Sequence, residues 1–224
     1  MIPSVVTKQD LEALVGKANE LAKEIGLTYN LSLDDITVRP RYVAENREEI
    51  VQGKFSPENG KITITYNNNQ FVIEKRAGTL LHETVHKKFE EEIMPYCKEK
   101  NSELVRAFNE GLGFAVDFFF DEKKYLPCLS HKDGLLTIFW PSPELSYAIA
   151  RVCKNGMSMD EIFGKVKTYL SAPLREIEDT QGYPFSVEYA RFIRNELGQN
   201  LDDIFQDKEE LAYVKSELAK EAAQ

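Results

Sequence analysis

Apolar positions repeat at helical spacing over several long segments of the chain. Between Thr7 and Gly26 they form one continuous stripe, which Thr7 opens as a candidate N-cap and Gly26 ends. Residues 102–122 carry a second apolar stripe. Further stripes occupy residues 141–153, 158–170, 185–197 and 207–224. The second half of the chain is therefore predicted to be mostly helical.

Alternating apolar and polar residues predict strands in the first half. Residues 36–38 form one short candidate strand. Residues 51–55 and 62–66 form a candidate hairpin, joined by the turn sequence Ser-Pro-Glu-Asn-Gly. We expect the sheet to resume over residues 71–74 and the next helix to begin near Arg76.

Together these elements predict an α+β protein. A small, mainly antiparallel sheet and the helix that begins near Arg76 would pack against the mostly helical second half. A second hairpin is expected at residues 125–140, around an Asp-Gly turn. We expect residues 1–224 to form a single domain, with approximate subdomains at residues 1–95 and 96–224.

Composition and charge narrow the classes of partner. Hydrophobic residues make up 42% of the chain and charged residues 29%, which is typical of a soluble globular protein. A formal net charge of −9 argues against a nucleic-acid partner, because such a partner requires a basic face. No apolar run reaches the length of a membrane span. The N-terminus has neither the basic region nor the apolar region of a signal peptide. We expect a cytoplasmic protein with no membrane partner, and the oligomeric state stays open.

The three cysteines are Cys97, Cys128 and Cys153. They are far apart in the sequence and form no C-x-x-C pair, so they indicate neither a disulfide framework nor a thiolate metal site. We expect reduced cysteines that serve as core residues.

The segment Thr79–Lys87 contains the pattern His-Glu-x-x-His. His82 and His86 are four positions apart, so on a helix both imidazoles leave the same face and can bind one metal ion. Glu83 follows the first histidine directly and would lie beside a water on that metal, where its carboxylate can accept a proton. The alternative is that the two histidines merely flank solvent on an amphipathic helix.

A third ligand is expected from another segment, because a catalytic zinc takes three protein ligands and leaves one position for water. Glu110 lies in the middle of an apolar helical stripe, where a carboxylate is costly unless a cation meets it. Gly111 and Gly113 follow it, and two glycines inside a helix indicate close approach to a neighbouring helix. These features make Glu110 the predicted third ligand.

Two further carboxylates share the predicted helix face of Glu110. Glu103 is a rival ligand, although a carboxylate is also favoured near a helix start. Asp117 would either accept a hydrogen bond from the second N–H of a ligand histidine or be a solvated surface charge. Both interpretations of Asp117 stay open.

The H-E-x-x-H motif at residues 82–86, followed by Asn-Glu-Gly at residues 109–111, resembles the gluzincin class of zinc metallopeptidases. The compact minigluzincin and peptidase-MA-like members are the most similar, and the order of elements over residues 61–198 is similar too. The alanine of their second motif is displaced to Ala115, and Phe114 stands where thermolysin-like members have an aspartate. The resemblance implies a zincin-like fold and a zinc-dependent peptidase that acts on a peptide or protein substrate.

The same resemblance implies roles for individual residues. His82, His86 and Glu110 would bind Zn²⁺, and Glu83 would be the general base. Tyr183 matches the leading tyrosine of a later helix in peptidase-MA-like proteins and would donate a hydrogen bond to the oxyanion. Tyr147 and His131 are weaker candidates for that donor. An edge strand that pairs with substrate would correspond to residues 61–67.

Two other functions use similar residues. A non-proteolytic binding or regulatory module could hold a structural zinc with the same ligands, but it would have no catalytic use for Glu83. Peptide deformylase also carries H-E-x-x-H, together with an upstream cysteine ligand. All three cysteines of this chain lie downstream of the motif, which argues against a deformylase.

Overall fold

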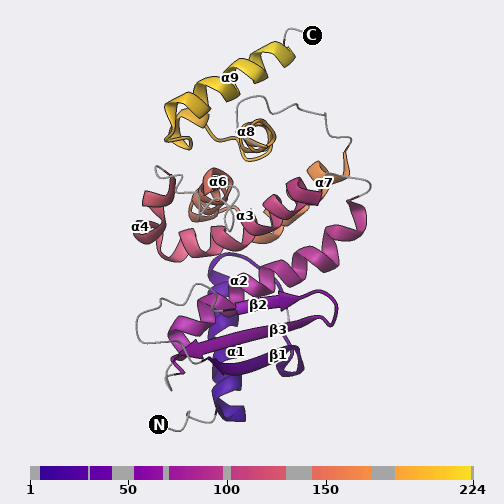
Figure 1. Cartoon of the computed structure of the whole chain (residues 1–224), viewed down its shortest axis with the longest axis vertical. Helices are drawn as coiled ribbons and strands as arrows, with labels where there is room; N and C mark the ends of the chain where they lie inside the picture. Colours follow the sequence, from indigo (N-terminus) through magenta and orange to yellow (C-terminus); the bar gives the residue numbers. More distant parts are fainter. Residues whose placement is uncertain are drawn as a thin grey trace. The chain divides into compact units, whose positions relative to one another are not determined.

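The computed structural model of the chain describes residues 6–29, 31–41, 53–67, 71–97, 102–129, 143–172 and 185–222. The chain divides into two units, Met1–Glu91 and Glu92–Gln224. Figure 1 labels the helices and strands of both. The described residues form an α+β protein in which helices predominate and a small sheet belongs to the first unit.

The first unit begins with helix α1 (Lys8–Glu24). Thr7 caps it as predicted, because its side chain accepts the N–H of Asp10 while the carboxylate of Asp10 accepts the N–H of Thr7. After α1, the chain passes through a short 3₁₀ turn, η1 (Leu33–Asp35), and then enters the sheet. Gly26, at a φ of 64°, ends α1 as expected.

The sheet has three strands: β1 (Ile36–Arg41), β2 (Gly53–Ser56) and β3 (Lys61–Asn67). Their order is β1-β3-β2, with β2 antiparallel and β1 parallel to β3. The predicted hairpin is confirmed, but the expectation of a mainly antiparallel sheet is wrong, because the sheet is mixed. The hairpin turn fixes only the β2–β3 pairing, whereas β1 reaches β3 through a long-range contact that local pattern does not specify.

The position of β3 corrects a second expectation. The resemblance implies a substrate-pairing edge strand at residues 61–67, but β3 is the central strand of the three. A central strand uses its hydrogen-bonding groups on both neighbours and has none left for a ligand strand. Among the described strands, β1 and β2 are the edges.

Helix α2 (Ile73–Glu92) follows β3. The strand expected over residues 71–74 is absent there: residues 71 and 72 have no regular structure, and the N–H of Arg76 already donates to the carbonyl of Val72 at 3.1 Å. A run of three apolar residues, Phe71–Ile73, does not distinguish a strand from the start of a helix, which explains the error.

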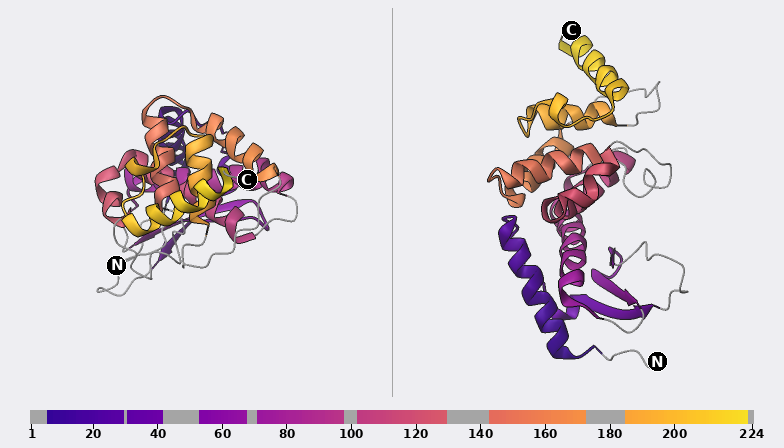
Figure 2. Two further views of the ribbon diagram at one scale, coloured as in Figure 1. Left: turned by 90° about the horizontal axis from the view of Figure 1, so that it is seen from above. Right: turned by 90° about the vertical axis from the view of Figure 1, so that its left-hand side faces the viewer.

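Both helices of the first unit lie on the same side of the sheet (Figure 2, right). Ile62 and Ile64 of β3 point inward and are fully buried, while Thr63 between them is partly exposed. They form one core with residues from α1, β1 and α2, namely Leu14, Ala18, Ile36, Ala77 and Leu80. This core fixes α2 against the sheet over the turns that lead to His82.

The regular elements among the described residues of the second unit are all helical. These are η2 (Met94–Tyr96), α3 (Ser102–Phe120), α4 (Glu122–Tyr125), η3 (Leu126–Leu129), α6 (Pro143–Lys154), α7 (Met159–Ser171), α8 (Ser186–Asn195), η4 (Leu201–Asp203) and α9 (Lys208–Ala222). The predicted helices in residues 102–122, 141–153, 158–170, 185–197 and 207–224 are confirmed over the described residues. Ser158 and Glu161 form a capping box at the start of α7. In the described part of the chain, no helix combines the length and apolar character needed to cross a membrane.

The second predicted hairpin is wrong over its described part. Residues 125–129, expected to form its first strand, are helical and belong to α4 and η3. Tyr125 and Leu129 pack with Phe118 of α3 and Ala150 of α6, so tertiary contacts favour a helical turn over the strand that the apolar run suggested. The expected turn and second strand, residues 130–140, lie outside the described residues.

Aromatic residues fill the centre of the second unit. The ring of Phe108 contacts the rings of Tyr169, Tyr189 and Phe192, with centroids 5.2–5.8 Å apart. Helix α3, which carries Phe108, also packs along α6. These contacts hold α3 at the centre of its unit.

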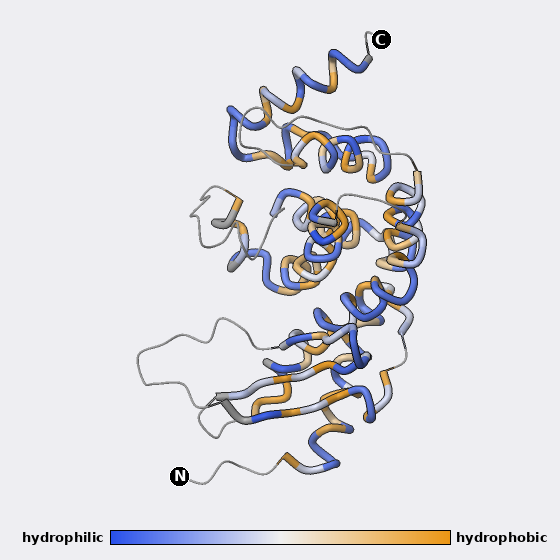
Figure 3. Tube along the Cα trace, turned by 45° about the vertical axis from the view of Figure 1, so that its right-hand side comes forward, coloured by the Kyte–Doolittle hydropathy of each residue, from blue (hydrophilic) through white to orange (hydrophobic). Residues whose placement is uncertain are grey.

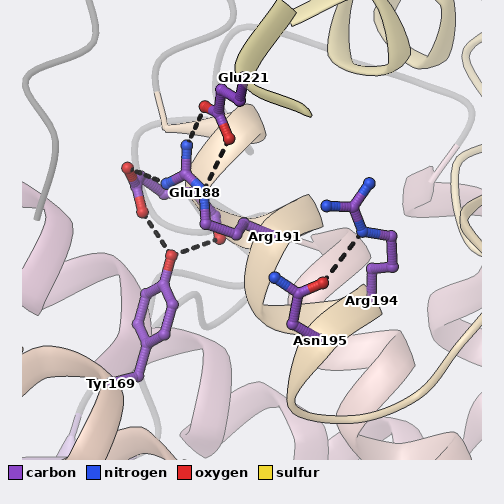
Figure 4. Close-up of polar contacts among 6 residues, drawn as sticks. All are labelled: Tyr169, Glu188, Arg191, Arg194, Asn195 and Glu221. Atoms are coloured by element: carbon purple, nitrogen blue, oxygen red, sulfur yellow. Dashed lines mark hydrogen bonds and ion pairs between the residues drawn. The ribbon is translucent and has the colours of Figure 1, made fainter. Parts of the chain in front are cut away.

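A buried polar network joins α7, α8 and α9 (Figure 4). The carboxylate of Glu188, only 3% exposed, accepts the hydroxyl of Tyr169 and pairs with Arg191. Arg191 also pairs with Glu221 of α9. Burial, together with the charge of Glu188, raises the pKa of Tyr169, so its hydroxyl stays a donor.

Helix α9 is mostly hydrophilic, with single hydrophobic positions at intervals (Figure 3). Val214 and Leu218 of that thin stripe are buried, and Leu211 is partly exposed. Ser186 of α8 donates to Glu210 at 2.5 Å. Helix α9 thus packs on α8 through a few apolar side chains and a set of polar contacts.

Candidate metal centre

The two histidines of the motif lie on one face of α2. Their ring centroids are 4.8 Å apart and their planes meet at 74°. His86 is buried and His82 is partly exposed. The helical spacing of four residues therefore places both imidazoles together, with one side of the pair open.

Packing holds the helix segment that carries them. Leu80, Leu81, Val85 and Phe89 are at most 1% exposed, so the segment of α2 around the two histidines is firmly packed. The hydroxyl of Thr84 is buried and satisfied within the helix, donating to the carbonyl of Leu80 at 2.7 Å. The two ring positions are thus set by a rigid segment and not by a loop.

Two buried lysines anchor the next turn of α2. Lys87 pairs with Asp35, with Nζ and Oδ1 2.9 Å apart, and Lys88 donates to the carbonyl of Thr28 at 3.1 Å. Burial by itself raises the pKa of Asp35, but hydrogen bonds from Lys87 and the Ser32 backbone, with the nearby positive charges, hold that pKa below its ordinary value. Asp35 is therefore ionised at neutral pH and ties η1 to α2.

Glu83 makes a contact that the sequence did not predict. The residue is 8% exposed, and its Oε2 accepts the backbone N–H of Phe55 at 2.7 Å. Strand β2 comes this close because Gly53 has no side chain. The available signal was a glycine inside an alternating strand pattern, which often marks close approach of another group.

The predicted third ligand, Glu110, lies on α3 and is partly exposed. One candidate ligand atom each of His82, His86 and Glu110 lie within 4.8 Å of one another. Among the described residues, the group contains neither Glu103, which is exposed, nor Asp117. Gly111 and Gly113, next to Glu110, are both buried.

Other candidates are placed elsewhere or not described. Tyr183, the predicted oxyanion donor, and His131 lie outside the described residues. The ring of Tyr147 packs against Phe118, 5.6 Å between centroids, in the aromatic cluster of α3, α4 and α6. Cys97 and Cys153 are free thiols, and burial raises the pKa of Cys153 to about 12.

The group of two imidazoles and a carboxylate has the chemistry of a divalent-cation site. Imidazole nitrogen and carboxylate oxygen are both zinc ligands, and three such donors with a fourth position left open are characteristic of catalytic sites. The adjacent Glu83 adds a carboxylate that is not among the three donors.

No family model matches the sequence, and no curated protein or solved structure is significantly similar to it. What the site does must therefore be inferred from its own residues.

Proposed function

We propose that this protein is a zinc-dependent peptidase with a zincin-like fold, resembling the gluzincins. The observation that carries the proposal is the clustering of one ligand-capable atom each from His82, His86 and Glu110 within 4.8 Å. The peptide or protein substrate and the cytoplasmic location expected from the sequence belong to the same proposal.

The three donors fit a zinc ion. Donors bonded tetrahedrally at about 2.1 Å from one ion are spaced about 3.4 Å apart. A group whose members already lie within 4.8 Å needs only small side-chain movements to reach that spacing. A zinc ion held there would supply Lewis acidity, both for activating water and for polarising the scissile carbonyl.

The remaining roles fall to residues of the chain. Glu83, next to His82, would accept a proton from the attacking water and deliver it to the leaving amine when the peptide bond breaks. The hydroxyl of Tyr183 would donate a hydrogen bond to the developing oxyanion. This assignment of Tyr183 rests on the sequence resemblance alone.

The contact of Glu83 with Phe55 favours a second candidate function. A non-proteolytic module with a structural zinc would now have a use for Glu83, because its carboxylate accepts the part-buried backbone N–H of Phe55 on the edge strand β2. The two functions differ in what Glu83 must do: a proton acceptor must be a carboxylate, whereas a hydrogen-bond acceptor need only be an oxygen.

Glu83→Gln separates the two. Glutamine keeps an oxygen for the N–H of Phe55 but is not a base. We expect the wild type to bind one zinc per chain and to hydrolyse a peptide library in a chelator-sensitive manner. Glu83→Gln should retain the zinc and lose hydrolysis by at least about a hundredfold. A wild type without metal or turnover, or a Glu83→Gln variant with unchanged turnover, would rule out the proposed mechanism.

A further inference from the structure

The free edge of β2 faces the carboxylate of Glu83. Strand β2 pairs with β3 along one edge, with Phe55 opposite Ile62. Successive N–H groups of a strand point to opposite edges, so the Phe55 amide that reaches Glu83 lies on the edge away from β3. The acceptor is the side chain next to the first histidine of the metal group.

Gly53, two residues earlier, faces the same carboxylate. A Cβ at this position would lie 2.8 Å from Cγ and 2.9 Å from Oε1 of Glu83, and 2.6 Å from Cγ2 of Thr79. Real Cβ atoms essentially never approach other atoms so closely, so β2 can lie this near α2 only because residue 53 is glycine. One carboxylate oxygen therefore lies against Gly53 while the other accepts the N–H of Phe55.

We propose that β2 positions Glu83, with Gly53 and the Phe55 amide as positioning residues for the general base. The inference rests on the proposed peptidase function. A side chain that moves protons must be held within a fraction of an ångström of its working geometry. Two contacts from one strand hold this carboxylate while His82 and His86 occupy another part of the α2 surface. The donor to Glu83 is the backbone N–H of Phe55, so no side-chain motif in the sequence identifies it.

Amide exchange tests the contact without reference to activity. In the wild type, we expect the Phe55 amide to exchange slowly, because it donates to a buried acceptor. Glu83→Ala removes the acceptor and should speed its exchange at least about tenfold. Glu83→Gln should keep the protection. The Lys54 amide, on the β3 side of the strand, is the internal control and should change little in either variant.

Activity tests the positioning role. Gly53→Ala should lower kcat about 10- to 100-fold, with KM within about threefold of the wild type, because the base is displaced. The zinc content should stay at one per chain. Gly78→Ala is the matched control and should keep the wild-type kcat. Gly78 lies on α2, the helix that carries Glu83, and a Cβ there would meet open space.

Crowding of Thr79 is the competing cause of a slow Gly53→Ala variant. Gly53→Ala combined with Thr79→Ser removes the methyl group that a new Cβ would meet but leaves the contact with Glu83. We expect kcat of the double variant to stay low. Recovery of the wild-type kcat would assign the effect to Thr79 packing and overturn the role of Gly53 toward Glu83.

The remaining outcomes distinguish the contact between Phe55 and Glu83 from its role in positioning the base. An unprotected Phe55 amide in the wild type, or protection that survives Glu83→Ala, refutes the contact whatever Gly53→Ala does. A Gly53→Ala variant with wild-type kcat refutes positioning. If Gly53→Ala does not fold, amide exchange decides alone. A wild type that shows a protected Phe55 amide but no hydrolysis refutes the peptidase and with it the positioning role, and leaves the contact as a structural one.

Discussion

Replacing Glu110 tests the ligand assignment on which the proposed function depends. Glu110→Gln is nearly isosteric, so it removes the charge of the side chain with little change in packing. The matched control is Glu103→Gln on the same helix. Glu103 is exposed and does not belong to the group of three clustered donors. The two variants lose the same charge and differ only in position.

The expected magnitude follows from the placement of Glu110. A carboxylate oxygen about 2.1 Å from a divalent ion, at an effective dielectric of about 20, has a gross attraction of about 16 kcal/mol. Most of this is offset by the desolvation of both charges. Mutating residues that only support a metal ligand already weakens metal affinity about 10- to 100-fold. For a direct ligand we therefore expect a loss of at least about a hundredfold, or about 2.7 kcal/mol.

Zinc affinity would be measured by competition with a chromophoric chelator, and circular dichroism would confirm that each variant folds. We expect Glu110→Gln to weaken zinc binding by the amount above and Glu103→Gln to stay within about threefold of the wild type, as is usual for an exposed side chain. Wild-type affinity in Glu110→Gln would remove Glu110 as a ligand and the proposed peptidase with it. Equal losses in both variants would indicate a nonspecific charge effect.

Two further predictions concern the framework of each unit. Arg191→Met leaves the carboxylate of Glu188 buried without its cation, so we expect a loss of about 3 kcal/mol in urea unfolding. Arg194→Met is the control and should cost less than about 0.5 kcal/mol, because Arg194 is exposed and donates to the neighbouring Asn195 (Figure 4). Similar losses in both variants would contradict the network. In the first unit, the lowered pKa of Asp35 means that its ionised form stabilises the fold above the unfolded pKa of about 3.9, and this contribution is lost as the pH falls through the folded value. The stability difference between wild type and Asp35→Asn should therefore be largest above about pH 5 and shrink on acidification, and a difference independent of pH would refute the ion pair as its source.

The sequence predicted features that depend on local spacing. A period of four placed His82 and His86 on one helix face, and the Asn-Gly-containing turn joined β2 to β3 as expected. Side-chain capping at Thr7 was also predicted, because both partners of a capping box are within three residues. In each case the interacting groups are neighbours in the chain.

Features that depend on distant partners were missed. Local pattern could not show that β1 pairs parallel to β3, and it assigned a free edge to the strand that lies in the middle. The apolar residues 125–129 suit either a strand or a helical turn, and packing against Phe118 decides for the helix. The sequence could not predict the partner of Glu83 for another reason. The group that donates to Glu83 is a backbone N–H, which every residue except proline carries.

The charge of the proposed donor set bears on the choice between the peptidase and the structural module. Two neutral imidazoles and one carboxylate would leave a divalent ion with a net charge of about +1, whereas the four thiolates of many structural sites would reverse its sign. A residual positive charge favours the negative charge that develops on a carbonyl oxygen under attack. Glu83, which β2 contacts through the Phe55 N–H, would add a proton acceptor without reducing this charge as a fourth ligand would. In the proposed peptidase, the three donors would hold the cation and Glu83 would accept the proton, which is the division of roles that hydrolysis requires. A structural module would use Glu83 only as the acceptor of the Phe55 N–H.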